Sequence, residues 1–106
     1  MVGAGYFAQF HRNAWTRIAG VELVAICDRD PAKTPDYPDA TAMLAAEALD
    51  ILDIAGPPPM HAATIRAALP HKPRAIICQK PFCLSLEEAE AVTAQAEAAD
   101  VPLIIH

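Results

Sequence analysis

The sequence has no long run of apolar residues. Its apolar blocks, such as residues 23–27, are far shorter than the roughly 20 residues that a helix needs to cross a bilayer. The first residues also lack the basic stretch followed by an apolar stretch that marks a secretory signal. We therefore expect a protein with no membrane partner that works in the cytoplasm.

Cysteine and positive charge are also scarce. The three cysteines, Cys27, Cys78 and Cys83, are odd in number and lack the spacing of a metal site, which favours reduced thiols and no bound metal. Eight Lys and Arg residues against 13 Asp and Glu residues give a net charge of -5. No basic stripe is available to neutralise phosphates, so we expect no nucleic-acid partner.

The sequence does contain a regular alternation of two kinds of segment. Short apolar blocks of strand length alternate with alanine-rich stretches of helical period, which predicts βαβ units around a parallel sheet. We expect strands at residues 21–27, 50–55, 74–78 and 103–105, and helices at residues 7–18, 41–49, 60–69 and 85–99. The predicted fold is α/β, a doubly wound parallel sheet of Rossmann type, and it forms one domain over residues 1–106.

Two local patterns refine this prediction. Ser85 followed by Glu88 is a capping box, which predicts the start of the last helix. Pro31, Pro35 and Pro38 crowd the segment after the first predicted strand and allow at most a short turn of helix there. We therefore expect the second crossover of the fold to be shortened.

A glycine turn opens the first predicted helix, where residues 3–8 read Gly-Ala-Gly-Tyr-Phe-Ala. In G-x-G-x-x-G/A turns the first glycine makes the turn, the second lets a pyrophosphate approach the backbone, and the last small residue lets helix and strand pack closely. The free N–H groups of the helix then face the phosphates. We assign five residues of this turn to a dinucleotide site: Gly3, Gly5, Tyr6, Phe7 and Ala8. A plain turn before a helix is the alternative interpretation.

An acidic residue stands where such a site needs one. Asp28 ends a predicted strand 20 residues after Ala8, where the fingerprint places a carboxylate that accepts the ribose hydroxyls. Because this carboxylate would repel a 2′-phosphate, the pattern favours NAD. The neighbouring Arg29 could receive such a phosphate, so NADP stays open.

Two further segments resemble sequence motifs of a known family. Residues 54–61, Ile-Ala-Gly-Pro-Pro-Pro-Met-His, resemble a strand-end segment that ends in P-P-x-x-H, and Gln79-Lys80-Pro81-Phe82 resembles an E-K-P motif. Together with the glycine turn and Asp28, these landmarks follow the order found in Gfo/Idh/MocA oxidoreductases. The chain resembles the N-terminal NAD(P)-binding domain of that family.

The resemblance implies hydride transfer between NAD(P) and an alcohol carbon of a sugar, an inositol or a similar polyol. It implies that Lys80 is catalytic, lying near the nicotinamide ribose and the substrate hydroxyl, often with a cis bond before the proline. The further candidates for contact with the cofactor are Pro57, Pro58, His61, Lys80 and Pro81. For His61, and for His11 on the first helix, a packing role is the favoured alternative.

Three features depart from the family pattern. Only Met1 and Val2 precede Gly3, whereas a strand averages about 5 to 6 residues, so we expect the slot of the first strand to be filled by preceding residues or by another segment, such as one from a second copy. Gln79 replaces the motif glutamate and removes a charge that could hold Lys80. The family's C-terminal domain, with its proton-transfer aspartate and histidine, lies outside residues 1–106.

We therefore expect a domain that binds a dinucleotide and shows no appreciable turnover alone, because a polyol or sugar would be held only together with a second domain. The alternative is a non-catalytic Rossmann-like module that has lost its cofactor and self-associates through a sheet edge or an apolar face. A homo-oligomer is compatible with either.

Overall fold

A parallel sheet lies at the centre of the computed structural model, which describes residues 1–106. Its three strands are adjacent in the order β1-β2-β3. They comprise Ile51–Ile54 (β1), Ala75–Cys78 (β2) and Leu103–Ile105 (β3). The register pairs Leu52 with Ile76 and Ile77 with Ile104.

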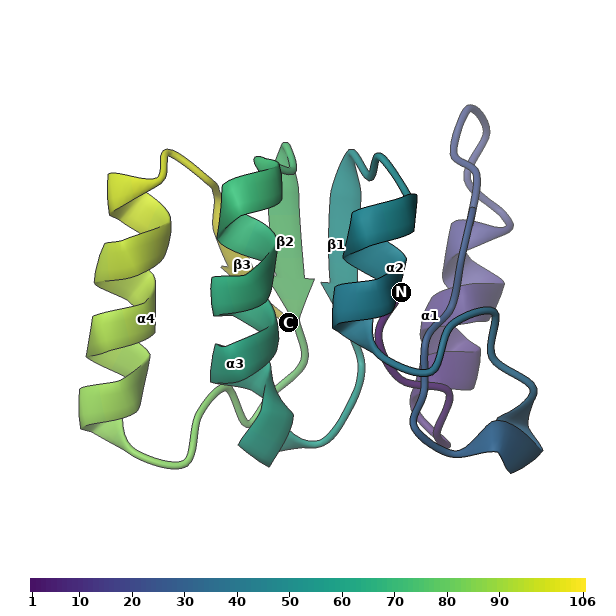
Figure 1. Ribbon diagram of the computed structural model, residues 1–106, viewed down its shortest axis with the longest axis horizontal. Helices are drawn as coiled ribbons and strands as arrows, with labels where there is room; N and C mark the ends of the chain where they lie inside the picture. Colours follow the sequence, from purple (N-terminus) through teal and green to yellow (C-terminus); the bar gives the residue numbers. More distant parts are fainter.

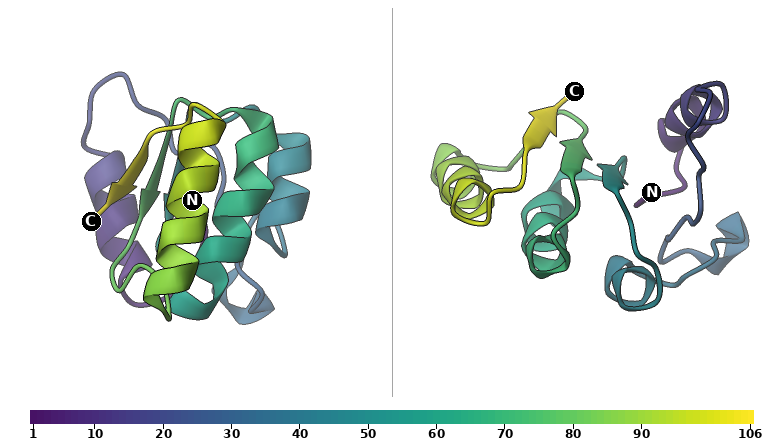
Figure 2. Two further views of the ribbon diagram at one scale, coloured as in Figure 1. Left: turned by 90° about the vertical axis from the view of Figure 1, so that its left-hand side faces the viewer. Right: turned by 90° about the horizontal axis from the view of Figure 1, so that it is seen from above.

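Helices cover both faces of this sheet. They comprise Ala8–Trp15 (α1), Ala40–Ala46 (α2), His61–Ala68 (α3) and Leu86–Ala98 (α4). The last three lie side by side on one face, and α1 lies on the opposite face (Figure 1; Figure 2, right). The predicted Rossmann-like α/β arrangement is therefore confirmed, with four helices and three strands close to their predicted positions. None of the helices has the length and apolar character of a membrane-spanning helix.

The predicted strand at residues 21–27 is wrong. Only Cys27 pairs, in isolated bridges to Val2 and Tyr37, and Val2 makes one further bridge, to Ile54. The physical reason is that a strand must satisfy its backbone polar groups. Residues 22–24 make no backbone hydrogen bond to another segment, whereas residues 25–28 bond only to residues 1–3, 36 and 37. Residues 21–24 instead border a groove of about 450 Å³ whose other wall includes residues 48–51. No other segment of residues 1–106 fills that slot.

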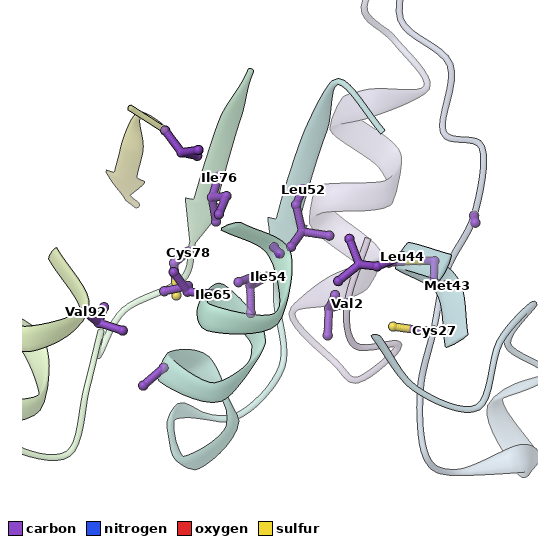
Figure 3. Close-up of a cluster of buried hydrophobic side chains, with 14 residues drawn as sticks. Val2, Cys27, Met43, Leu44, Leu52, Ile54, Ile65, Ile76, Cys78 and Val92 are labelled. Carbon is purple, nitrogen blue, oxygen red and sulfur yellow. The ribbon is translucent and has the colours of Figure 1, made fainter. Parts of the chain in front are cut away.

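Most of the core lies on the face covered by α2, α3 and α4. Leu52 and Ile54 of β1 and Ile76 of β2 point to this face and are fully buried together with Ile65 and Val92 (Figure 3). Burying one such side chain stabilises the fold by roughly 1.5–3 kcal/mol. The α1 face carries only a small buried apolar cluster of Met1, Ala8 and Ala55. The α2–α4 face therefore supplies most of the hydrophobic stabilisation.

Both refinements from local patterns are confirmed. The Ser85 hydroxyl accepts the N–H of Glu88 at 3.1 Å and caps α4, while the Glu88 carboxylate reaches back to the N–H of Leu84 at 3.4 Å. The proline-rich crossover holds only the single 3-10 turn Pro31–Lys33 (η1). Two further 3-10 turns, Pro58–Met60 (η2) and Leu69–His71 (η3), flank α3.

The cysteines provide a test of this fold. Cys27 and Cys78 are buried whereas Cys83 is partly exposed, and burial raises the pKa of Cys78 to about 12. Because the thiolate is the reactive form, we predict that a thiol reagent at neutral pH labels Cys83 first in the native protein and all three cysteines after denaturation. Peptide mass spectrometry after timed labelling measures this order. Native labelling of Cys78 as fast as that of Cys83 would contradict the burial of β2.

Candidate functional site

The candidate residues follow strand ends at one edge of the sheet. Gly3 comes after the bridge residue Val2, Asp28 after Cys27, and Gly56 after β1. All these pairings are parallel, so the carboxyl ends of the segments meet at the same edge. Open α/β sheets bind their ligands at this edge.

A groove of about 790 Å³ opens there. It brings together four of the predicted residues, Gly3, Asp28, Arg29 and Pro57. Its size lies within the range of about 300–1,000 Å³ that is usual for ligand pockets. Its lining also includes side chains that the sequence did not single out, among them Lys33, Asp39, Thr41, Met60 and Thr64.

The glycine turn has the geometry that its pattern predicts. Gly3 has a φ of +98°, and a Cβ added to it would lie 2.8 Å from the backbone N of Gly56. A Cβ added to Gly5 would meet nothing within 4 Å, so the backbone faces open space there. Ala8 is 2% exposed and packs with Met1 and Ala55, which brings α1 close to the sheet. No side chain caps the N-terminus of α1.

Asp28 ties the glycine turn to the neighbouring segment. Its carboxylate accepts the N–H of Ala4 at 2.7 Å, the N–H of Asp30 at 2.9 Å and the Lys33 ammonium at 3.1 Å. Burial alone would raise the pKa of Asp28, but the two N–H groups and Lys33 outweigh it, so the pKa lies below its ordinary value. The carboxylate is therefore ionised and fixed at the mouth of the groove.

Tyr6 and Phe7 do not line the groove. Both are largely exposed, at 72% and 62%, and form an edge-to-face cluster with Phe10 on the outer side of α1. Their place in the sequence motif therefore does not bring their rings to the groove surface.

His61 lies behind the groove wall rather than in it. Its side chain is fully buried at 0% exposure. The ring nitrogens lie 2.7 Å from the carbonyl oxygen of Gly56 and 2.9 Å from that of Phe82. The ring thus lies between the loop after β1 and the loop after β2, and both ring nitrogens face protein carbonyl oxygens rather than the groove. The structure corrects its assignment as a cofactor contact to the packing role.

Lys80 stands exposed at the carboxyl end of β2, and its peptide bond to Pro81 is cis. Its backbone N–H donates to the Gln79 side-chain oxygen at 2.9 Å and to the carbonyl oxygen of His106 at 3.0 Å. Pro58 lies in η2, next to Pro57 on the loop after β1. Lys80, Pro58 and Pro81 therefore lie at the predicted edge of the sheet but outside the lining of the groove.

Sequence reasoning missed two charged residues near these elements. Lys33 pairs with Asp28 from η1, and its only sequence signal is a cation five residues beyond the acidic residue. Asp53 is 4% exposed and bonds to His11 and Trp15 of α1. Its signal is an aspartate inside the otherwise apolar strand Ile51–Ile54.

Comparison with known proteins identifies the family. Residues 1–106 match the Gfo/Idh/MocA family, an oxidoreductase family with an NAD-binding Rossmann fold. The chain belongs to the Gfo/Idh/MocA family. The resemblance drawn from its motifs is thus confirmed, and this Gfo/Idh/MocA chain corresponds to the NAD-binding domain of its relatives.

Three similar proteins show what share of a full-length family member this chain covers. A D-apiose dehydrogenase of Paraburkholderia graminis is 41% identical over 116 residues, which cover 100% of this chain and 31% of the relative. An inositol 2-dehydrogenase of Acidothermus cellulolyticus is 28% identical over 107 residues, covering 85% and 31%. The crystal structure of an oxidoreductase from Agrobacterium radiobacter in complex with NAD+, L-tartaric acid and magnesium matches with a TM-score of 0.92 at 38% identity, covering 99% of this chain and 33% of that one. The chain spans about a third of the length of these relatives.

The two glycines of the Gfo/Idh/MocA turn make a matched pair for a stability test. Gly3→Ala combines a left-handed backbone with a clash against Gly56, so we predict a loss of about 2–5 kcal/mol in the free energy of unfolding. Gly5→Ala meets open space and should change that free energy by less than about 1 kcal/mol. Urea denaturation of both variants measures the difference. Equal stabilities would show that the turn does not have this geometry.

Proposed function

We propose that residues 1–106 form the NAD-binding domain of a dehydrogenase that transfers a hydride between NAD and an alcohol carbon of a sugar, an inositol or a similar polyol. The observation that carries this proposal is the joining of the glycine turn to Asp28 by the 2.7 Å hydrogen bond from Ala4, at the mouth of one groove. The dehydrogenase names of the relatives support the reaction class.

The turn and Asp28 fit a dinucleotide. The backbone at Gly5 has the open space that a pyrophosphate needs to approach it. The uncapped N-terminus of α1 offers N–H groups and a positive dipole end to the phosphates. In this proposal Asp28 accepts the ribose hydroxyls of the adenosine half. In this proposal Gly3, Gly5 and Ala8 seat the pyrophosphate, and Pro57 forms a wall of the groove.

Lys80 is the catalytic residue of the proposal. The nicotinamide supplies the hydride chemistry when it is bound, and the chain supplies the groups around it. Lys80 lies at the carboxyl end of β2, where its ammonium can hold a substrate hydroxyl or exchange a proton with it through Nζ. Its backbone is fixed by the bonds to Gln79 and His106.

The cofactor of the proposal is NAD rather than NADP. The carboxylate of Asp28 disfavours a 2′-phosphate, which is the reason to expect NAD. Lys33 lies 3.1 Å from that carboxylate and Arg29 lines the same groove, so two cations stand close enough to offset part of the repulsion. We therefore expect NADPH to bind measurably, but more weakly than NADH.

The substrate-binding part of the enzyme lies outside residues 1–106 in this proposal. The chain corresponds to about a third of the length of its relatives. In this proposal the dinucleotide occupies the groove beside Asp28. We expect binding without appreciable turnover from this chain alone. A second candidate, a self-associating module without cofactor, is favoured by the groove beside residues 21–24, a segment that pairs with no strand.

Titration calorimetry with NADH tests the proposal. We predict saturable binding that Asp28→Ala weakens at least about tenfold, because charge-assisted hydrogen bonds to the ribose are lost. The matched control is Glu97→Ala on the exposed surface of α4, which removes the same charge and should leave the affinity unchanged. Gly5→Ala should also weaken binding while the domain stays folded. Absence of NADH binding at millimolar concentration, together with self-association in sedimentation experiments, would favour the second candidate.

A further inference from the structure

A partly buried polar cluster under α1, centred on Asp53, has no part in the proposed cofactor groove. Asp53 points from β1 toward α1 and is 4% exposed. Its carboxylate accepts the Trp15 indole N–H at 2.6 Å and lies 2.9 Å from Nδ1 of His11. A buried carboxylate is strongly destabilising unless it is paired and hydrogen-bonded. These partners are therefore held firmly in place.

The cluster extends from His11 to the segment that carries Lys80. Nε2 of His11 lies 3.2 Å from the side-chain nitrogen of Gln79. The Gln79 side-chain oxygen, on the other side of that amide, accepts the backbone N–H of Lys80 at 2.9 Å. The contacts thus form a chain from Asp53 through His11 and Gln79 to Lys80.

Donor and acceptor chemistry fixes the direction of each hydrogen bond between Asp53 and Lys80. An amide nitrogen only donates, so Nε2 of His11 must accept, and Nδ1 must carry the proton that is donated to Asp53. With the Gln79 amide reversed, its NH₂ group would face the N–H of Lys80, and two donors would oppose each other. The tautomer of His11 and the orientation of Gln79 therefore determine one another.

We propose that His11 is a positioning residue for Lys80, acting through the Gln79 amide from an anchor at Asp53. This inference rests on the proposed function, because the position of Lys80 matters only if Lys80 is the catalytic residue of that function. It assigns a role to a histidine on the first helix that lies 68 residues from Gln79 in sequence. The cluster holds the Lys80 backbone from the α1 face, whereas His61 joins the loops after β1 and β2 from the α3 side.

These contacts from Asp53 to Lys80 also give a reason for glutamine at position 79. A glutamate there would present acceptor oxygens to both His11 and the N–H of Lys80. His11 could then bond to it and still donate to Asp53 only if both ring nitrogens carried protons. Glutamine supplies one donor and one acceptor, which match a neutral imidazole and a backbone N–H. Gln79 thus holds Lys80 by hydrogen bonding, without the charge of the family motif.

Nuclear magnetic resonance of the ¹⁵N-histidine-labelled chain tests the bond directions. We expect Nδ1 of His11 to carry a proton and Nε2 to carry none. The His11 signals are assigned by their loss in His11→Gln. In Gln79→Glu we expect both ring nitrogens of His11 to be protonated. A wild-type His11 with its proton on Nε2 would overturn the proposal.

Ligand binding then tests the effect on Lys80. Gln79→Leu breaks the link without disturbing the buried Asp53–His11 pair, and we expect it to weaken NADH binding about three- to tenfold, the equivalent of one hydrogen bond. ADP-ribose, which lacks the nicotinamide, should bind as it does to the wild type. His11→Phe should behave in the same way, and His11→Gln, which can donate to Asp53 and accept from Gln79, should restore NADH binding.

The outcomes separate this inference from the proposed function. Equal weakening of NADH and ADP-ribose binding by Gln79→Leu would show a merely structural role and overturn the positioning of Lys80. Unchanged NADH binding in Gln79→Leu would overturn it as well. If the wild-type chain bound neither ligand, the proposed function itself would fail, and the positioning role would fall with it.

Discussion

The site depends on a very short backbone ladder at the start of the chain. Val2 donates its N–H to the carbonyl oxygen of Asp53 at 2.7 Å and accepts the N–H of Ala55 at 2.8 Å, while Gly3 donates to the carbonyl oxygen of Cys27 at 2.8 Å. These bonds place the glycine turn between the segment that ends at Asp28 and the loop after β1. Val2 is 1% exposed, so burial of its side chain reinforces the ladder. The segment that ends at Asp28 and the loop after β1 form walls of the groove because the bonds of Val2 and Gly3 hold them on either side.

The strand β1 then serves three regions at once. Leu52 and Ile54 face the apolar core under α2 and α3, Asp53 faces the polar cluster under α1, and Gly56 lies just beyond the end of the strand against Gly3. The alternation of side chains in a strand makes this division of faces possible. Packing on one face thus fixes the polar contacts on the other, and both fix the position of the groove wall.

Most of the fold could be predicted from the sequence because its signals are local. The strands near residues 50–55, 74–78 and 103–105 have apolar runs, and Ser85 with Glu88 marks the start of α4 through contacts within one turn. Residues 21–27 have an equally apolar pattern but do not form a strand, because strand formation depends on a neighbour that local sequence does not describe. The full burial of His61 and the bond between His11 and Asp53, 42 residues apart, are likewise tertiary facts. The contact between the glycine turn and Asp28 was predictable because the two follow a pattern of fixed spacing.

The claim that the glycine turn and Asp28 together form the dinucleotide site is tested most directly by mapping NADH onto the chain. Backbone ¹H–¹⁵N spectra recorded during a titration would locate the contact residue by residue. We expect the largest shifts on Gly3, Ala4, Gly5 and Asp28, with the amides of α4 unmoved. Shifts confined to another surface, or no shifts at saturating NADH, would contradict it.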